Sequence, residues 1–95
     1  MICHLQLVSQ HGCHAIGRDQ LPLVIGRGPD VGLRLNDRWV SRRHCELLEC
    51  EGQLVVRDVG ARNGLFLNGT QVDQAPLQSG DQLIIGIERF RVEVE

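Results

Sequence analysis

Three short polar segments of this sequence combine residue types that suit binding of a phosphate group. They are Gly26-Arg27, Ser41-Arg42-Arg43-His44 and Asn63-Gly64. An arginine offers a planar, permanently charged fork of N–H donors that matches phosphate oxygens, and a serine hydroxyl adds a neutral donor. An asparagine amide can donate and accept, which suits contact with a peptide main chain. Together the three segments indicate a site for a compact phosphorylated ligand.

The positive charge of the chain is concentrated around these segments. Between Gly26 and His44 there are five arginines and two aspartates, whereas the whole chain carries a net charge of −2. A basic patch on an acidic body suits a compact anion, while a nucleic acid favours an extended basic stripe. We therefore expect no nucleic-acid partner. The alternative, DNA binding by the patch, predicts salt-sensitive binding that does not depend on Arg27.

Short apolar runs between glycines and prolines must position the polar segments. No stretch between successive glycines and prolines is long enough for a sustained amphipathic helix. Near the end of the chain, apolar and charged residues alternate as in a half-buried strand, with Phe90, Val92 and Val94 at the apolar positions. Asn68-Gly69 is a strong hairpin signal. The expected strands occupy residues 2–8, 21–25, 33–35, 45–50, 53–59, 65–67, 82–85 and 89–95. Many short strands with turns between them predict an all-β sandwich or barrel.

Length and composition limit the class of protein. A chain of 95 residues suits one domain, residues 1–95, and no apolar run approaches the roughly 18 residues that span a bilayer. The start of the chain, Met1 to His4, lacks the basic and apolar regions of a signal peptide. We expect a cytoplasmic domain with no membrane partner, monomeric or part of a larger chain.

The cysteines and histidines do not indicate a metal or cofactor. Cys45 and Cys50 lie on one expected strand about 16 Å apart, which is too far for a disulfide. Cys3 and Cys13 could face each other across a hairpin, and a reducing cytosol would keep all four cysteines as thiols. The histidines near residues 4–14 match no familiar zinc module.

The ordered set of motifs resembles the forkhead-associated (FHA) domain family. Gly26-Arg27 and Ser41-x-x-His44 are followed by two Asn-Gly pairs, and Leu77-Gln-Ser-Gly-Asp-Gln-Leu83 looks like the family's Leu-x-x-Gly-Asp-x-Leu signature. The resemblance runs from Leu23 to the end of the chain, and residues 1–22 fit the first two strands by pattern only. It implies an antiparallel β-sandwich of about eleven short strands whose loops at one end bind phosphothreonine peptides.

The resemblance also implies a role for individual residues. Arg27 matches the family's phosphate-binding arginine, and Ser41 matches its phosphate-binding hydroxyl. Arg42 stands where a second phosphate contact is often found. His44 corresponds to a histidine that braces the loops without touching ligand, and Asn63 to the asparagine that holds the peptide backbone.

One loop departs from the family pattern. The family usually has Gly-Ser-Thr-Asn-Gly-Thr where this chain has Gly60-Ala-Arg-Asn-Gly-Leu65. Ala61 removes a small hydroxyl, and Arg62 replaces a threonine that can touch phosphate, so Arg62 is a candidate for another cationic contact. Gly26 and Gly64 are expected to support the binding loops, Gly64 by permitting a left-handed turn.

Simpler readings apply to several of these residues. Arg27 could be a solvated arginine and Ser41 a turn cap, although their order in the motif set favours binding. We expect Arg43 to be a solvated neighbour of the site. Val40 is the better candidate for burial, so Trp39, the one tryptophan, is expected to face outward and contact a partner.

The rival functions are an enzyme and a phosphate-independent interaction module. Ser41 and His44 could suggest a hydrolase, but no nucleophile elbow is present, and Gly26-x-Gly28 is followed by a strand-like run rather than a helix. We therefore expect no catalytic activity. The preferred function is a phosphothreonine-binding module in Ser/Thr kinase signalling, and the alternative is an FHA-fold scaffold that ignores phosphate. The chain has a single threonine, Thr70, in a predicted turn, so the target is expected in another chain.

Overall fold

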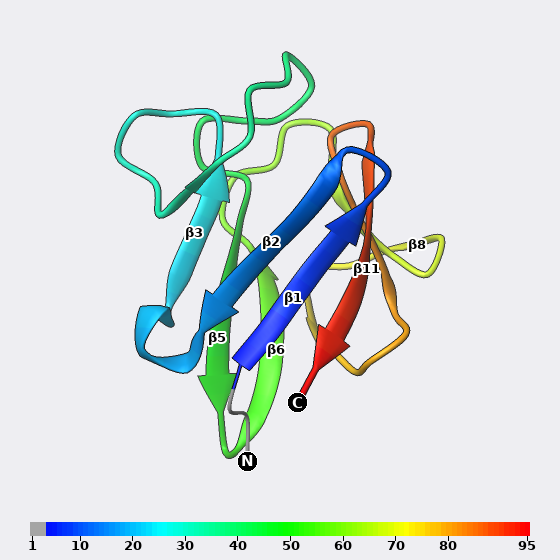
Figure 1. Ribbon diagram of the computed structural model, residues 1–95. Coiled ribbons are helices and arrows are strands. Elements are labelled where there is room, and N and C mark those ends of the chain that lie inside the picture. Colours follow the sequence, from blue (N-terminus) through cyan, green and yellow to red (C-terminus); the bar gives the residue numbers. More distant parts are fainter. Residues whose placement is uncertain (1–3) are drawn as a thin grey trace.

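The structure is a computed structural model that describes residues 4–95. These residues form two packed β-sheets with one short 3-10 helix, and Figure 1 shows the two layers with their connecting loops at both ends. The predicted β-sandwich is confirmed. Cys13, which the sequence offered as a possible neighbour of Cys3 across a hairpin, pairs instead with Val8, and Cys3 itself lies outside the described residues.

The first sheet contains six strands in the order β2-β1-β11-β10-β7-β8. All its neighbouring strands pair antiparallel. Its strands are β1 (His4–Ser9), β2 (Gly12–Gly17), β7 (Leu65–Leu67), β8 (Thr70–Gln71), β10 (Gln82–Ile85) and β11 (Glu88–Val94).

The second sheet contains five strands in the order β4-β3-β5-β6-β9, and β3 pairs parallel with β4. Its strands are β3 (Leu23–Gly26), β4 (Leu33–Arg34), β5 (Cys45–Cys50), β6 (Gln53–Asp58) and β9 (Gln74–Pro76). The 3-10 helix η1 (Arg18–Gln20), which the sequence patterns did not predict, connects β2 to β3.

The core lies between the sheets and is built from alternating positions of the strands. In β11, Phe90 and Val92 are buried while Arg89 and Arg91 are exposed, as predicted. Other buried side chains come from both layers and include Leu5, Leu7, Ile25, Leu47, Val56, Leu65, Leu83 and Ile85. Burial of this aliphatic set supplies the main driving force for packing the two sheets.

The predicted Asn68-Gly69 hairpin is confirmed. Both residues have positive φ, +51° and +86°, and Leu67 pairs with Thr70 across the turn. Positive φ at both central positions is the geometry that Asn-Gly sequences favour. Cys45 and Cys50 stand at opposite ends of β5, the first buried and the second exposed.

Candidate phosphopeptide-binding site

The three polar segments that the sequence singles out lie at the same end of the sandwich. Arg27 directly follows β3, Ser41 lies between β4 and β5, and Asn63 lies between β6 and β7. Figure 1 shows these three connections side by side at the top of the molecule. Residues separated by up to 36 positions in sequence are therefore brought to one rim because β3 and β6 end, and β5 begins, at this end.

Arg27 is fixed against the β4–β5 loop by its backbone and its side chain. The Arg27 N–H donates to the Ser41 carbonyl (2.9 Å), and the Gly28 N–H donates to the Arg42 carbonyl (3.0 Å). The Arg27 Nε donates to the Val40 carbonyl (3.0 Å). With Nε engaged and the residue exposed, the two terminal nitrogens remain available for a ligand.

Gly26 is the residue that lets these two segments approach. It is buried, and a Cβ at this position would lie 2.1 Å from the Arg42 carbonyl oxygen. A side chain cannot occupy that space, because the contacting atoms belong to backbone. The glycine is thus required for close packing of the loop, as expected of a residue that supports the site.

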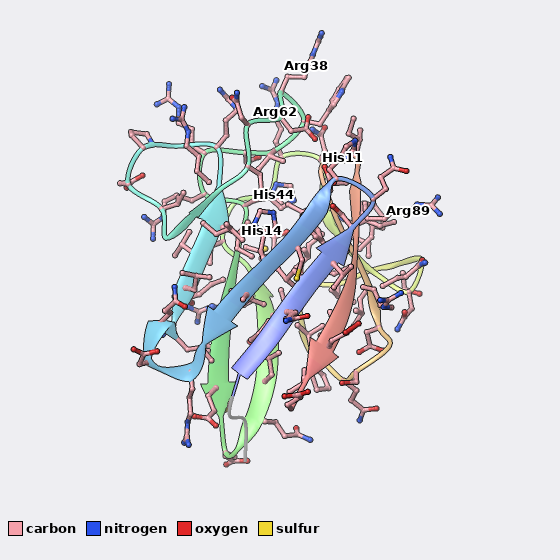
Figure 2. The ribbon with its side chains drawn as sticks, in the orientation of Figure 1. His11, His14, Arg38, His44, Arg62 and Arg89 are labelled. Atoms are coloured by element: carbon pink, nitrogen blue, oxygen red, sulfur yellow. The ribbon has the colours of Figure 1, made fainter. Side chains whose placement is uncertain are left out.

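His44 joins the loop that carries Ser41 to the loop that carries Asn63. Its side chain is fully buried; its Nδ1 lies 3.1 Å from the Ser41 N–H and its Nε2 3.1 Å from the Gly64 carbonyl oxygen. Because the Ser41 N–H is a donor, Nδ1 must accept, and the ring proton therefore lies on Nε2 and is donated to Gly64. This is the bracing position that the family resemblance implies for His44, and Figure 2 shows the ring beneath the loops.

Burial favours the neutral form of His44. The pKa of His44 is lowered from its ordinary value, mainly because burial withdraws the imidazolium from water. The hydrogen bond to Gly64 and the carboxylates of Asp58 and Asp37 oppose this shift in part. A neutral ring also matches the hydrogen bonds, since a protonated Nδ1 could no longer accept from Ser41.

Ser41 and Asn63 are held by the neighbouring loops. The Arg62 N–H donates to the Ser41 Oγ (2.8 Å), and the Asn63 Nδ2 donates to the Trp39 carbonyl (3.2 Å). The Ser41 oxygen accepts in this arrangement, which leaves its proton free to donate. The Asn63 side chain is exposed, and within residues 4–95 its Oδ1 has no partner, so it can accept from a ligand N–H.

Two carboxylates that the sequence motifs did not mark shape the loops. Asp58 Oδ1 accepts the N–H groups of Gly60 and Ala61, both at 2.8 Å, and so fixes the start of the β6–β7 loop. Asp37 Oδ1 accepts the Trp39 N–H at 2.9 Å. An aspartate two residues before the N–H that it receives is the pattern of an Asx turn, which is the signal that could have identified both residues.

The loop arginines give the rim its positive charge. Arg42 and Arg62 are exposed and, within the described chain, have no carboxylate partner. Figure 2 shows Arg62 projecting from the top of the molecule. Arg43 instead contacts Asp30 at 3.2 Å, with both side chains more than half exposed, as suits a solvated neighbour. Cations without partners around a fixed hydroxyl can attract and hold an oxyanion.

A β-sandwich that presents arginine, serine and asparagine from adjoining loops has the architecture of a loop-based binding module. The sequence model of the family described as "FHA domain" matches residues 23–86. The chain belongs to the FHA domain family.

Several known proteins are similar over most of the chain. It is 42% identical to the glycogen accumulation regulator GarA of Mycolicibacterium smegmatis and 39% identical to the oxoglutarate dehydrogenase inhibitor of Corynebacterium efficiens, each over 90% of this chain. The alignments cover 55% and 61% of those two proteins, so the chain spans just over half the length of these curated relatives.

Solved FHA domains have the same fold. The FHA domain of FhaA, in complex with the intracellular domain of Rv3910, superposes with a TM-score of 0.78 at 32% identity, over 95% of this chain and 98% of that one. Another, from work on phosphothreonine-dependent FHA domain interactions, gives a TM-score of 0.83 at 30% identity, over 97% and 95% of the two chains.

Proposed function

We propose that this domain binds a phosphothreonine-containing segment of another protein and thereby mediates interactions controlled by Ser/Thr kinases. The observation that carries this proposal is the His44 bridge, which places the loops of Ser41 and Asn63 at fixed positions beside Arg27. A phosphate carries three acceptor oxygens and close to two negative charges. The terminal nitrogens of Arg27 and the hydroxyl group of Ser41 can donate hydrogen bonds to those oxygens.

The remaining site residues take supporting roles in this proposal. Arg42 and Arg62 add charge beside the phosphate, and Asn63 holds the main chain of the bound segment. Gly26, His44 and Gly64 keep the loops in place without contacting ligand. Gly64 has a φ of +87°, which only glycine adopts without strain.

We infer a regulatory rather than catalytic role. The relatives are named as a regulator and an inhibitor. The geometry adds a physical argument, because His44 Nδ1 accepts the backbone N–H of Ser41 and is thus occupied, so it cannot take a proton from the Ser41 hydroxyl. We further propose that residues 1–95 act as one binding domain in the cytoplasm. No helix among residues 4–95 has the length and apolar character to cross a membrane.

The proposal is tested by titrating one peptide in three forms, with phosphothreonine, aspartate or threonine at the central position. We expect binding of the phosphothreonine form only, because aspartate offers a single charge and two coplanar oxygens. Loss of the Arg27 charge leaves the phosphate partly unpaired, so Arg27→Ala should weaken binding at least ~30-fold, equivalent to about 2 kcal/mol.

A matched control distinguishes the loss of a site arginine from a general change in the charge of the protein. Arg18→Gln removes the cation at the first residue of η1, which pairs with Glu49 at 2.9 Å, and should leave peptide affinity unchanged. Equal affinity for the phosphothreonine and threonine peptides would favour a phosphate-independent scaffold. Salt-sensitive DNA binding that survives Arg27→Ala would favour a nucleic-acid partner.

A further inference from the structure

Within the described chain, β2 is an edge strand with one side that no other strand pairs with. The other edge strands, β4, β8 and β9, contain two or three residues, and β9 includes Pro76, whereas β2 contains six residues. Proteins protect exposed edges by short strands, charged side chains or proline. The sequence of β2, residues 12–17, contains no Asp, Glu, Lys, Arg or Pro, so β2 lacks these three protections.

The hydrogen bonds of β11 show which way the backbone of β1 points. The Val92 N–H donates to the Asp81 carbonyl, and the Val92 carbonyl accepts from the Gly80 N–H, both at 2.8 Å. The backbone groups of Val92 therefore point away from β1. Val92 lies opposite Leu7 of β1, so this pair shares no hydrogen bond, and the N–H and C=O of Leu7 point toward β2.

The backbone groups of β2 alternate in direction from this starting point. Leu7 lies opposite His14, so the N–H and C=O of His14 bond to β1, and those of Cys13 and Ala15 point to the unpaired side. The Gly17 N–H also points that way and donates to a side chain of η1 instead. Among residues 4–95, the four backbone groups of Cys13 and Ala15 have no partner. Free groups at alternate residues are what an added strand pairs with.

A groove runs beside the unpaired side of β2. In Figure 1, β3 of the second layer lies beyond this side of β2. His14 and Phe90 of the first sheet line a hollow of about 290 Å³ together with Leu35. In β4, Leu33 pairs with the buried Ile25 and so faces the first layer, yet Leu33 and Leu35 are only partly buried. The two sheets are thus incompletely closed at this side, and aliphatic surface remains to be covered.

We propose that β2 binds an extended segment of a partner protein, which adds to the six-stranded sheet as a further antiparallel strand. The segment bonds to the backbone of Cys13 and Ala15 and points aliphatic side chains at every second position into the groove. Because β2 and the leucines beside it carry no charge, an uncharged inner face suits the groove. A second copy paired through its own β2 would bring its second layer against β3, so a single extended segment fits better. This interaction does not use phosphate and goes beyond the proposed function.

The probe is an acetylated seven-residue peptide, Thr-Val-Thr-Val-Thr-Val-Thr, in which the three valine amides are N-methylated. Its free N–H groups lie on one side, so it can extend a sheet but cannot form sheets of its own. In an antiparallel pair, opposite residues share a face. The threonines that bond to Cys13 and Ala15 therefore lie on the outer face with them, and the valines point into the groove. The control is the isomer with methyl groups on its last three threonine amides, which turns threonines toward the groove.

Two measurements test the proposal. The valine-methylated peptide should bind at least ~10-fold more tightly than its isomer, because burial of one aliphatic side chain is worth roughly tenfold or more in affinity. Hydrogen exchange followed by NMR gives the place of binding. The amides of Cys13 and Ala15 should exchange rapidly in the free protein and become protected by the probe. Those of His14 and Ile16, which bond to β1, should be protected throughout.

Variants separate strand addition from phosphate binding. Ala15→Pro removes a free N–H at a position where an edge strand tolerates proline, and it should weaken probe binding ~5-fold or more. The matched variant Ala15→Ser keeps the N–H and should bind the probe as the original protein does. Both variants should bind the phosphothreonine peptide with unchanged affinity, whereas Arg27→Ala should leave probe binding unchanged.

The possible outcomes distinguish this inference from the proposed function. No binding of the probe, or equal affinity for the two isomers, overturns the inference alone. Cys13 and Ala15 amides that stay unprotected with probe bound, or probe binding that Arg27→Ala reduces, also overturn it. Failure of the phosphothreonine peptide to bind, with probe binding intact, overturns the proposed function alone. Protection of Cys13 and Ala15 that rises with protein concentration in the absence of probe would assign β2 to a second copy and contradict the inference.

Discussion

The hydroxyl oxygen of Ser41 accepts a 2.8 Å hydrogen bond from the backbone N–H of Arg62. This contact joins the β4–β5 and β6–β7 loops at their exposed side, while His44 joins them at their buried side. The bond uses the oxygen as acceptor and leaves the Ser41 proton for a ligand. The same residue is therefore both a link between loops and a proposed phosphate donor.

Replacing Ser41 with alanine should weaken phosphothreonine-peptide binding by roughly 10- to 100-fold, because a hydrogen bond to a charged group is worth about 1.5–3 kcal/mol. The folded state should change little, since the Arg62 N–H is at an exposed residue and can turn to water. Calorimetric titration and thermal unfolding measure the two effects. Ser41→Thr keeps the hydroxyl and should recover most of the binding; failure of threonine to do better than alanine would contradict the donor role.

The sequence patterns were informative where a strand is central and well buried. The bounds of β5, β7 and β10 were predicted to the residue, because aliphatic runs there are closed by turn residues. The patterns were weak at β2 and β9, which are edge strands of their sheets. In β2 only Ile16 is buried, and β9 ends in Pro76, which an edge strand tolerates. A strand with few buried side chains shows little hydrophobic periodicity, so its sequence does not reveal its position.

For the candidate site, the sequence could predict the residue types, but it could not predict the contacts that hold those residues in position. Arg27, Ser41, His44 and Asn63 stand in recognisable motifs, and the structure brings their loops together. The groups that orient them are largely backbone atoms, such as the Val40 and Trp39 carbonyls. Every residue has such a carbonyl, so no pattern of side chains marks which one is used. Tertiary packing alone decides that.

Gly26→Ala should damage both folding and binding. The added methyl group would lie 2.1 Å from the Arg42 carbonyl oxygen and 3.0 Å from that of Ser41, so the β4–β5 loop must move. Forcing a methyl into a packed site costs typically about 1–3 kcal/mol, which chemical denaturation can measure. Gly69→Ala is a useful comparison, because its φ of +86° is strained for alanine but nothing lies within 4 Å. That variant should lose stability with peptide affinity intact. Unchanged affinity in Gly26→Ala would argue against close packing of Gly26 on the β4–β5 loop.

Cys45 should be far less reactive than the exposed cysteines. Burial, with a contribution from the Asp58 carboxylate, raises the pKa of the Cys45 thiol to about 12, so almost none is thiolate at pH 8. Cys13 and Cys50 are exposed. In a Cys3→Ser background, iodoacetamide should modify Cys13 and Cys50 of the folded protein, and Cys45 only after denaturation. Peptide mass spectrometry distinguishes the three sites, and rapid labelling of native Cys45 would show that the core at β5 is open.

The neutral His44 ring couples the binding loops to pH. Its pKa is lowered in the folded protein, so below the unfolded value of about 6.5 the unfolded chain binds a proton that the folded chain does not. The stabilisation is therefore complete above pH ~6.5 and is lost as the pH falls through the folded pKa. Protonation of Nδ1 would also break the hydrogen bond from Ser41.

Two measurements test this coupling. The ring nitrogens of His44, observed by NMR at neutral pH, should report the tautomer with the proton on Nε2 and should titrate below pH 6.5. The free energy of unfolding should decrease between pH 7 and pH 5. It is a better readout than peptide affinity, because the phosphate itself has a pKa near 6. His11→Gln removes an exposed histidine whose contact lowers the pKa of Glu88, and it should leave the His44 titration unchanged. A His44 pKa at or above 6.5 would contradict the buried, neutral bridge on which the geometry of the loops depends.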